Sequence, residues 1–472
     1  MQLKFAAGML TPLIIATALF MENMDATVIS TSLPAIARDL LVDPISLKLA
    51  LTSYLVSLAV FIPISGWMAD RYGARRVFRS AIAVFMLGSV LCGFSRSLEG
   101  FVLARFIQGM GGAMMVPVGR LVILRTTRKE ELVRALSYLT IPALLGPVIG
   151  PPLGGFISTY FHWRWIFFIN IPIGILGIGL AGRFIENLKE EHLPPLDKLG
   201  FVFTGVGLSL LMLGLATEGK HMLSMELSLL VTVLGAALLL AYLWHYRRVA
   251  DPLLDLSLLR LPTFHASVIG GFLFRVGIGA TPFLLPLMLQ LGFAYSPFES
   301  GMLTCSTAIG AIFMKTIVAR VLERFGFKKV LTWNTVLVAL SLAAYGLFRS
   351  DTPHILMLLV FILGGCLRSL QFTSLNAIAF ADVEQSRMSH ATSLSSVAQQ
   401  LAAGFGVTVA ALALQGVSSW QQHVVLQSSD FAWSFVVMGV LTLASVLLFI
   451  PLDGKSGAEL ASTASRDDNH GS

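Results

Sequence analysis

Long apolar stretches follow one another along almost the whole chain and are separated by short polar segments. A helix needs about 20 apolar residues to cross the hydrocarbon core of a bilayer. Fourteen stretches reach or approach that length, so the pattern predicts an all-α integral membrane protein with 14 transmembrane helices. Their expected limits are residues 10–36, 46–69, 77–96, 98–124, 134–160, 164–186, 199–217, 224–246, 263–292, 298–322, 328–348, 354–380, 390–416 and 431–452.

The composition excludes most alternatives to a membrane protein. Of the 472 residues 56% are hydrophobic and 12% are charged, whereas about 25% are charged in ordinary soluble domains. Nucleic-acid binding, disorder and a disulfide-linked secreted fold are therefore poor fits. The three cysteines lie singly in apolar stretches and are expected to be core residues. Neither a cofactor nor a metal is expected. We find no GxxxxGK[ST] motif for ATP and no arrangement typical of an enzyme.

Basic residues mark one side of the membrane. Short loops rich in Lys and Arg stay in the cytoplasm. Such loops follow the even-numbered stretches, which predicts a multi-pass protein with both termini cytoplasmic. The densest clusters are Arg71, Arg75, Arg76 and Arg79 after the second stretch, and Arg125, Arg128, Lys129 and Arg134 after the fourth.

A seven-residue pattern occurs twice, once in each half of the chain. Residues 70–76 read DRYGARR after the second stretch, and residues 323–329 read ERFGFKK after the tenth. Six stretches surround each copy once the seventh and eighth are set aside. The economical interpretation is two six-helix bundles related as parallel repeats, with a two-helix hairpin inserted between them. The expected boundaries are residues 1–198 for the first bundle and its connector, 199–262 for the hairpin and its connector, 263–452 for the second bundle, and 453–472 for a disordered cytoplasmic tail.

Four motifs in this order resemble those of the major facilitator superfamily. Residues 66–76 read GWMADRYGARR, like its loop signature, and residues 103–109 read LARFIQG, like its fourth-helix motif. Residues 146–155 read GPVIGPPLGG, like the fifth-helix motif of its exporters. Residues 24–29 read MDATVI, similar to the first-helix motif of the fourteen-spanner drug:proton antiporters, and the likeness is greatest to bacterial multidrug-export proteins of that subfamily. The resemblance implies a transporter of small molecules and protons in the lipid bilayer of the bacterial inner (cytoplasmic) membrane. It also implies a central cavity lined by core helices one, four, seven and ten.

Charged residues inside the apolar stretches are the sharpest functional signal. Each costs about 2.5–3.5 kcal/mol or more at the centre of the membrane. Glu22 and Asp25 fall on the first core helix and Arg105 on the fourth. A rise of about 1.5 Å per residue gives Asp25 and Arg105 similar depths, so they could pair. We expect Asp25 to carry the coupling proton, Arg105 to tune it, and Glu22 to assist or to contact substrate. The alternative is a static ion pair that only fixes two helices.

Two further arginines, Arg275 and Arg368, fall on the seventh and tenth core helices. Two acids against three arginines favour substrates that are neutral, zwitterionic or carry an anionic group. The alternatives are that the arginines bind backbone carbonyls and that the polar amides only hold helices together. The expected substrate cavity comprises Glu22, Asp25, Gln108, Arg275, Arg368, Gln371 and Asn376.

Two other motifs suggest moving parts. The loop after the second helix is a candidate gate or latch, beyond its role in setting sidedness; its residues are Gly66, Asp70, Arg71, Gly73, Arg75 and Arg76. We expect Asp70 to face the N-terminus of another helix, and the arginines to bind Glu130, Glu131 or anionic lipid. Small residues on helix five predict a closely packed seam on which the two halves rock, or ordinary helix packing. They are Gly146, Pro147, Gly150, Pro151, Gly154 and Gly155.

Together these features predict a proton-coupled exporter of amphipathic small molecules that works by alternating access, as a monomer and with no nucleic-acid partner. One alternative is an exporter dedicated to a single metabolite, such as an organic acid, a sugar or a siderophore. Uptake by symport is disfavoured by the exporter-like fifth helix. A membrane sensor that binds without transport would be expected to have lost Asp25 or Arg105, and an ion channel would not be expected to show the two-bundle repeat.

Overall fold

The computed structural model describes residues 2–126, 132–190, 195–217, 224–249, 251–384, 387–423 and 425–454. Every regular element within these ranges is a helix. The chain forms two compact units, residues Met1–Leu254 and Asp255–Ser472. The tail expected to be disordered lies outside the described residues from position 455 onward.

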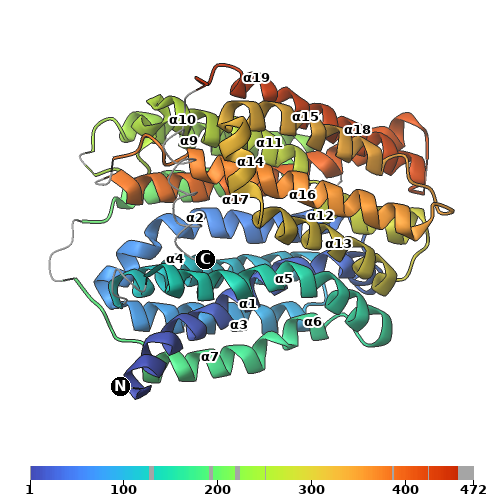
Figure 1. Cartoon of the computed structure of the whole chain (residues 1–472). Coiled ribbons are helices and arrows are strands. Elements are labelled where there is room, and N and C mark those ends of the chain that lie inside the picture. The colour runs from blue at the N-terminus through green and yellow to red at the C-terminus, as the bar shows by residue number, and fades with distance from the viewer. Residues whose placement is uncertain are drawn as a thin grey trace. The chain divides into compact units, whose positions relative to one another are not determined.

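Unit 1 holds ten of the described helical elements (Figure 1). They are α1 (Gln2–Asp39), η1 (Pro44–Leu47), α2 (Lys48–Tyr72), α3 (Ala74–Phe94), α4 (Leu98–Thr126), α5 (Leu132–Tyr160), α6 (Trp165–Phe168), α7 (Asn170–Phe184), α8 (Lys198–Thr217) and α9 (Met225–His245). The last two form the predicted hairpin, and α8 packs against both α9 and α2. The hairpin therefore belongs to the same compact unit as the first six-helix bundle.

Unit 2 contains the elements from η3 onward. They are η3 (Leu256–Arg260), α10 (Pro262–His265), η4 (Ala266–Gly270), α11 (Gly271–Ile278), α12 (Thr281–Leu287), η5 (Met288–Gly292), α13 (Pro297–Lys315), α14 (Val318–Phe325), α15 (Phe327–Tyr345), α16 (His354–Ile378), α17 (Met388–Trp420), α18 (Ser428–Ala444) and α19 (Val446–Phe449). The seventh core helix is the interrupted run from α10 to η5. Its two π-helical segments, η4 and η5, flank α11 and α12.

The same helix pairing occurs in both units. In unit 1, α1 packs along α5, α2 along α4, and α3 along α7. In unit 2, α11 packs along α17, α13 along α16, and α15 along α18. These are the first-with-fifth, second-with-fourth and third-with-sixth pairs of each bundle. Equivalent helices therefore have equivalent neighbours, as two structural repeats require.

Twelve described helices are long and apolar enough to cross a membrane. The pair α13 and α14, bent by 59° at a short break, makes a thirteenth if it counts as one span. The predicted fifth stretch coincides with α5, but the side chains of residues 132–144 lie outside the description. The count of 14 membrane-spanning helices therefore stays a prediction.

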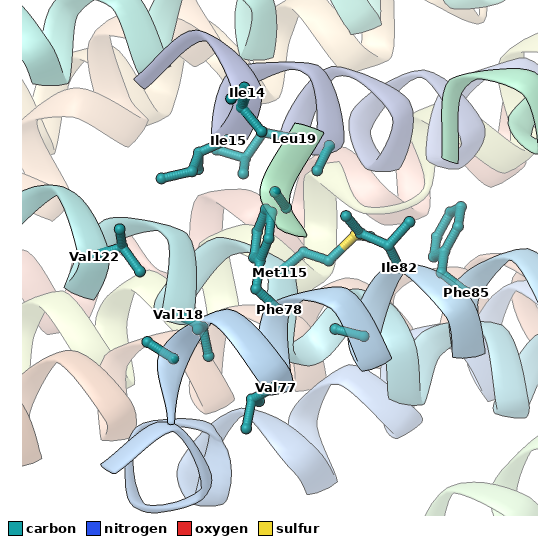
Figure 2. Close-up of a cluster of buried hydrophobic side chains, with 14 of the residues drawn as sticks. Ile14, Ile15, Leu19, Val77, Phe78, Ile82, Phe85, Met115, Val118 and Val122 are labelled. Carbon is teal, nitrogen blue, oxygen red and sulfur yellow. The ribbon is translucent and has the colours of Figure 1, made fainter. Parts of the chain in front are cut away.

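An apolar cluster joins α1, α3 and α4 in unit 1 (Figure 2). Ile15, Phe78, Phe85 and Met115 are each 0% exposed within it. Because lipid is as apolar as these side chains, their close packing rather than the hydrophobic effect holds the helices together. This cluster fixes the three helices beside the polar residues described next.

Candidate functional site

A polar cluster inside unit 1 is centred on Asp25 of α1. Arg105 of α4 donates from Nη1 to Asp25 Oδ2 at 2.7 Å, which is the pair expected from the sequence. Gln108, three residues further along α4, donates from Nε2 to Asp25 Oδ1 at 2.9 Å. Its Oε1 accepts from Arg105 Nη1 at 2.6 Å. The three side chains therefore form a closed ring of hydrogen bonds between two helices.

Two residues that the sequence analysis did not single out complete the cluster. Asn170, the first residue of α7, donates to Asp25 Oδ1 at 2.8 Å and to Ser89 Oγ of α3 at 3.1 Å. Gln108 also donates to Ser89, at 2.8 Å. An amide in the apolar segment around position 170 is a recognisable signal. Ser89 gives no such signal, because serine is common in helix packing.

The cluster is closed to solvent in this conformation. Asp25 is 3% exposed, Arg105 is 1% exposed and Gln108 is fully buried. The ring of Tyr54 on α2 lies 4.2 Å from Arg105 Cζ, a cation–π contact. Asp25 thus accepts three hydrogen bonds as a carboxylate, and its charge is balanced by one guanidinium.

Glu22, one turn earlier on α1, has different surroundings. It is half-buried, and its buried Oε2 has no hydrogen-bond partner in the described part of the chain; Tyr54 Oη has none either. A Cβ placed on Gly112 would lie 3.1 Å from Tyr54 Oη and 3.6 Å from Glu22 Oε1, so these groups converge. Of the two carboxyl groups on this face of α1, Asp25 is paired with Arg105, whereas Glu22 forms no ion pair with a described residue.

Arg275 and Arg368 lie in unit 2, on α11 and α16. Arg275 is 4% exposed; it donates from Nη2 to Asn376 Oδ1 at 3.2 Å and from Nη1 to the Ser267 carbonyl at 3.4 Å. Arg368 is half-buried and donates from Nε to the Gly364 carbonyl at 3.2 Å. Neither arginine forms an ion pair with any described residue. Carbonyl contacts were the alternative expectation for both, and each makes one.

The remaining predicted cavity residue, Gln371, is held in the interior of unit 2. It is fully buried and donates to Thr335 Oγ1 at 2.8 Å, while its Oε1 accepts from Asn334 at 2.9 Å. Both partners lie on α15. Gln371 thus joins the fourth and third helices of its bundle, as Gln108 does through Ser89 in unit 1. Asn376, in contrast, has an exposed side chain.

The small residues of α5 form a close seam with α1. A Cβ on Gly146 would lie 2.8 Å from Asn23 Cβ, one on Gly150 would overlap Thr27 Oγ1, and one on Gly154 would overlap the Val28 carbonyl. The described close contacts of this stripe are therefore with α1 of the same unit, which fits the alternative of ordinary helix packing; a seam between the two halves stays a prediction. A stripe of small residues predicts a close approach but does not identify the partner helix.

Other members of the predicted seam support the same pairing. Thr31 on α1 donates to the carbonyl of Pro151 at 3.2 Å, and Thr27 donates to that of Gly146 at 3.3 Å. Pro147 is half-buried beside them, and Gly155 is buried. These cross-helix hydrogen bonds hold α1, and with it Asp25, in a fixed position relative to α5.

The candidate gating loop is tied to two other segments of unit 1. Asp70 Oδ1 pairs with Arg125 Nη1 at 2.8 Å, and Arg125 Nη2 pairs with Glu190 at 3.1 Å. The described partner of Asp70 is therefore a side chain at the C-terminal end of α4, whereas a helix N-terminus was expected. The backbone N–H of Glu190 also donates to the Asp70 carbonyl at 3.1 Å.

Gly73 allows the tight turn of this loop. Its φ of +96° is a conformation that favours glycine, and the Asn187 side chain covers it. The described contacts give the three arginines of the loop no ion pair; Glu130 and Glu131, their expected partners, lie outside the described residues. Arg71 and Arg76 are exposed, and Gly66 and Arg75 are half-buried.

Comparison with known proteins agrees with this architecture. The family model described as Major Facilitator Superfamily matches residues 15–255 and 267–467. The chain is 36% identical over 440 residues to the "Putative multidrug resistance protein MdtD" of Salmonella paratyphi A, which covers 92% of this chain and 93% of the relative. The protein of the same name from Salmonella typhimurium is 36% identical over 444 residues, with the same coverage.

Solved structures show the same fold at low sequence identity. A D-xylose-proton symporter superposes with a TM-score of 0.69 at 14% identity, over 94% of this chain and 98% of that one. A POT family transporter in complex with 5-aminolevulinic acid gives 0.70 at 16% identity, over 94% and 95%. The chain therefore belongs to the major facilitator superfamily, a family of multi-pass membrane transporters of small molecules rather than of enzymes.

Proposed function

We propose that the protein is a proton-coupled exporter of amphipathic small molecules, which works by alternating access in the bacterial inner membrane with both termini in the cytoplasm. The observation that carries this proposal is the buried cluster around Asp25. A membrane protein retains a charged pair in its interior at a high cost, and such residues commonly belong to ion or proton pathways. The names of the MdtD relatives support export of drug-like molecules.

Asp25 is the proposed proton carrier. As a carboxylate it accepts hydrogen bonds from Arg105, Gln108 and Asn170. A proton on Asp25 would remove one of these acceptor positions and leave the Arg105 guanidinium buried without a counter-charge. Protonation is therefore favourable only if α1, α4 and α7 move relative to one another. Linking a proton to a helix movement is what coupled transport requires.

Glu22 is proposed to assist this step. It lies about one helical turn from Asp25, at i and i−3 on the same face of α1. Since no described cation pairs with it, it can gain or lose a proton without breaking an ion pair. We assign it a relay role, or a contact with substrate next to Tyr54 and Gly112.

The loop after α2 and the seam of α5 are proposed to act in the conformational cycle. The pairs from Arg125 to Asp70 and Glu190 can hold the cytoplasmic ends of α2 and α4 and the segment after α7 together. The closeness of α5 to α1 would transmit any movement of α1 to α5, because neither helix can tilt alone without a clash at Gly150 or Gly154.

A second candidate function is export of one dedicated metabolite, such as an organic acid. Arg275 and Arg368 have no acidic partner among the described residues, and they favour an acidic metabolite over a sugar or a siderophore. A broad efflux panel distinguishes this candidate from a multidrug pump, because only one compound class would be transported.

The test is transport in proteoliposomes with an imposed pH gradient, with ethidium and norfloxacin as a cationic and a zwitterionic probe. We expect gradient-driven transport in the wild type, abolition by a protonophore, and a fall to the gradient-free rate in Asp25→Asn. Asp351→Asn, which removes an exposed carboxylate from the loop before α16, is the matched control. Undiminished coupling in Asp25→Asn would remove this assignment, and binding without flux in the wild type would indicate a sensor.

A further inference from the structure

The two units carry the same arginine–glutamine pattern on equivalent helices but balance its charge differently. Arg105 precedes Gln108 by three residues on α4, and Arg368 precedes Gln371 by three residues on α16. In unit 1 the first helix supplies Asp25 to the arginine. In unit 2 the equivalent helix supplies a second arginine, Arg275, which packs against α16.

Arg275 is buried with its hydrogen-bonding capacity only partly used. Its two described hydrogen bonds, to Asn376 and to the Ser267 carbonyl, are long and have neutral acceptors. Its Nε is buried and has no partner among the described residues. The ring of Phe372 lies 5.6 Å from its Cζ. A buried guanidinium with these surroundings lacks the counter-charge that normally offsets the cost of burial.

Two residues on one face of α16, Phe372 and Asn376, contact this guanidinium. Arg368, Phe372 and Asn376 follow one another at four-residue spacing, so they line the same face of the helix. Phe372 also contacts the ring of Phe274 edge-on, with centroids 6.2 Å apart. This face of α16 thus carries the guanidinium of Arg368, an aromatic ring and an exposed amide, and Arg275 of α11 contacts the last two. Its neutral amide, Asn376, occupies the position where an anion would pair with Arg275.

The backbone on the other side of Arg275 is suited to rearrangement. The π-helical segment η4 ends at Gly270, immediately before the α11 helix that carries Arg275. A Cβ on Gly271 would approach Arg275 Nη1 to 2.5 Å, so the guanidinium lies directly on the glycine surface of its own helix. π-helical turns of this kind are frequent at functional sites, and discontinuous helices form substrate sites in transporters.

We propose that Arg275 binds the carboxylate of an aromatic substrate, which displaces the Asn376 amide and stacks on Phe372. The planar guanidinium can donate two parallel hydrogen bonds to a carboxylate, whereas it has one weak bond to the amide. Arg368 provides a second positive charge on the same face. This assignment rests on the proposed transport function and adds the substrate class, aryl carboxylates.

The test measures binding and needs no gradient, so a failure of proton coupling would not affect it. Equilibrium dialysis of the detergent-purified full chain compares 2-naphthoate with 2-naphthamide, which has the same ring system without the charge. We expect the wild type to bind naphthoate at least about tenfold more tightly, since hydrogen bonds to charged groups contribute about 1.5–3 kcal/mol. Arg275→Gln should bring naphthoate to the affinity of naphthamide, and Arg275→Lys should recover part of the preference.

Two variants guard against trivial explanations. Arg320→Gln removes an exposed arginine of α14 and should leave the preference unchanged, which controls for net charge. Asn376→Asp supplies an internal carboxylate to Arg275; it should weaken naphthoate selectively and spare naphthamide, even if Arg275→Gln does not fold. Equal affinities in the wild type, binding of neither probe, or a preference that survives both Arg275→Gln and Asn376→Asp would overturn the proposal. In each of these cases pH-driven transport of ethidium or norfloxacin would leave the proposed function standing.

Discussion

The buried ion pair predicts a large difference in stability between two arginine variants. Arg105→Gln leaves the carboxylate of Asp25 in the interior without its counter-charge. Both side chains of that pair are 1% exposed, and their nearest atoms lie 2.7 Å apart. Removing one partner of such a pair typically costs about 3–5 kcal/mol. For a unit of this size that corresponds to a fall in melting temperature of roughly 10 °C, at about 2–4 °C per kcal/mol.

A surface ion pair in unit 2 provides the matched control. Arg387 pairs with Asp255, and their side chains are 35% and 20% exposed. Burial raises the pKa of Asp255, but hydrogen bonds from Ser257 and Arg387 outweigh it and leave that pKa below its usual value, so the pair is charged at neutral pH. Solvent screening limits an exposed pair to about 0–1 kcal/mol. Arg387→Gln should therefore lower the melting temperature by no more than about 4 °C.

The native cysteines supply the assay. Cys92 is fully buried in unit 1, next to Gln108, and Cys366 is buried in unit 2. With the other cysteines replaced by serine, a thiol-reactive fluorophore reports the unfolding of one unit at a time during heating in detergent. Arg105→Gln is read at Cys92 and Arg387→Gln at Cys366. If the two substitutions shift their melting temperatures by the same few degrees, the cluster around Asp25 is not a desolvated ion pair and the coupling argument loses its physical basis.

Two glycine predictions follow from the packing, and the same assay checks both. Gly150→Leu should cost about 1–3 kcal/mol or more by overpacking against Thr27. Gly179→Leu on α7, where a Cβ meets nothing within 4 Å, should be close to neutral; equal effects would contradict the seam with α1. Gly73→Ala should destabilise the protein more than Gly326→Ala. Both glycines have a positive φ, at +96° and +74°, so an alanine at either position is strained by about 1–2 kcal/mol. Only the Cβ at position 73 also meets a side chain, that of Asn187. Equal losses of stability would show that the Asn187 side chain moves aside at no cost.

Residues that cost much free energy to bury could be recognised from the sequence. A charge inside an apolar stretch must have a partner or a function, and the first and fourth stretches each carried one near the same depth. The pair between Asp25 and Arg105 could therefore be predicted before any contact was known. The repeat was visible for the same reason, since two charged, glycine-containing loops stood at equivalent places in the chain.

Features that depend on which helices become neighbours were not visible. Asn170 reaches Asp25 because α7 packs beside α1, and Ser89 reaches Gln108 and Asn170 because α3 packs beside α4 and α7. The glycine stripe of α5 specified a close approach without naming α1 as the partner. The π-helical segments around Arg275 have no pattern of apolar spacing that distinguishes them from an α-helix. The bend of 59° between α13 and α14 likewise follows no proline or glycine at the break.

The two repeats keep their packing and differ in their charges, and this contrast indicates where function resides. Gly150 contacts α1 in unit 1, and Gly406 contacts Gly279 and Val276 of the equivalent helix in unit 2, so the first-with-fifth seam is present in both. The arginine and glutamine of the fourth helix are also present in both, but the charged residue of the first helix differs. Unit 1 has Asp25 balanced by Arg105, whereas Arg275 and Arg368 of unit 2 pair with no acid among the described residues. A scaffold requirement would act on both units alike, because both have the same helix pairing. The difference in charge therefore fits the proposed division of labour, in which unit 1 would handle the proton and unit 2 the charged group of the substrate.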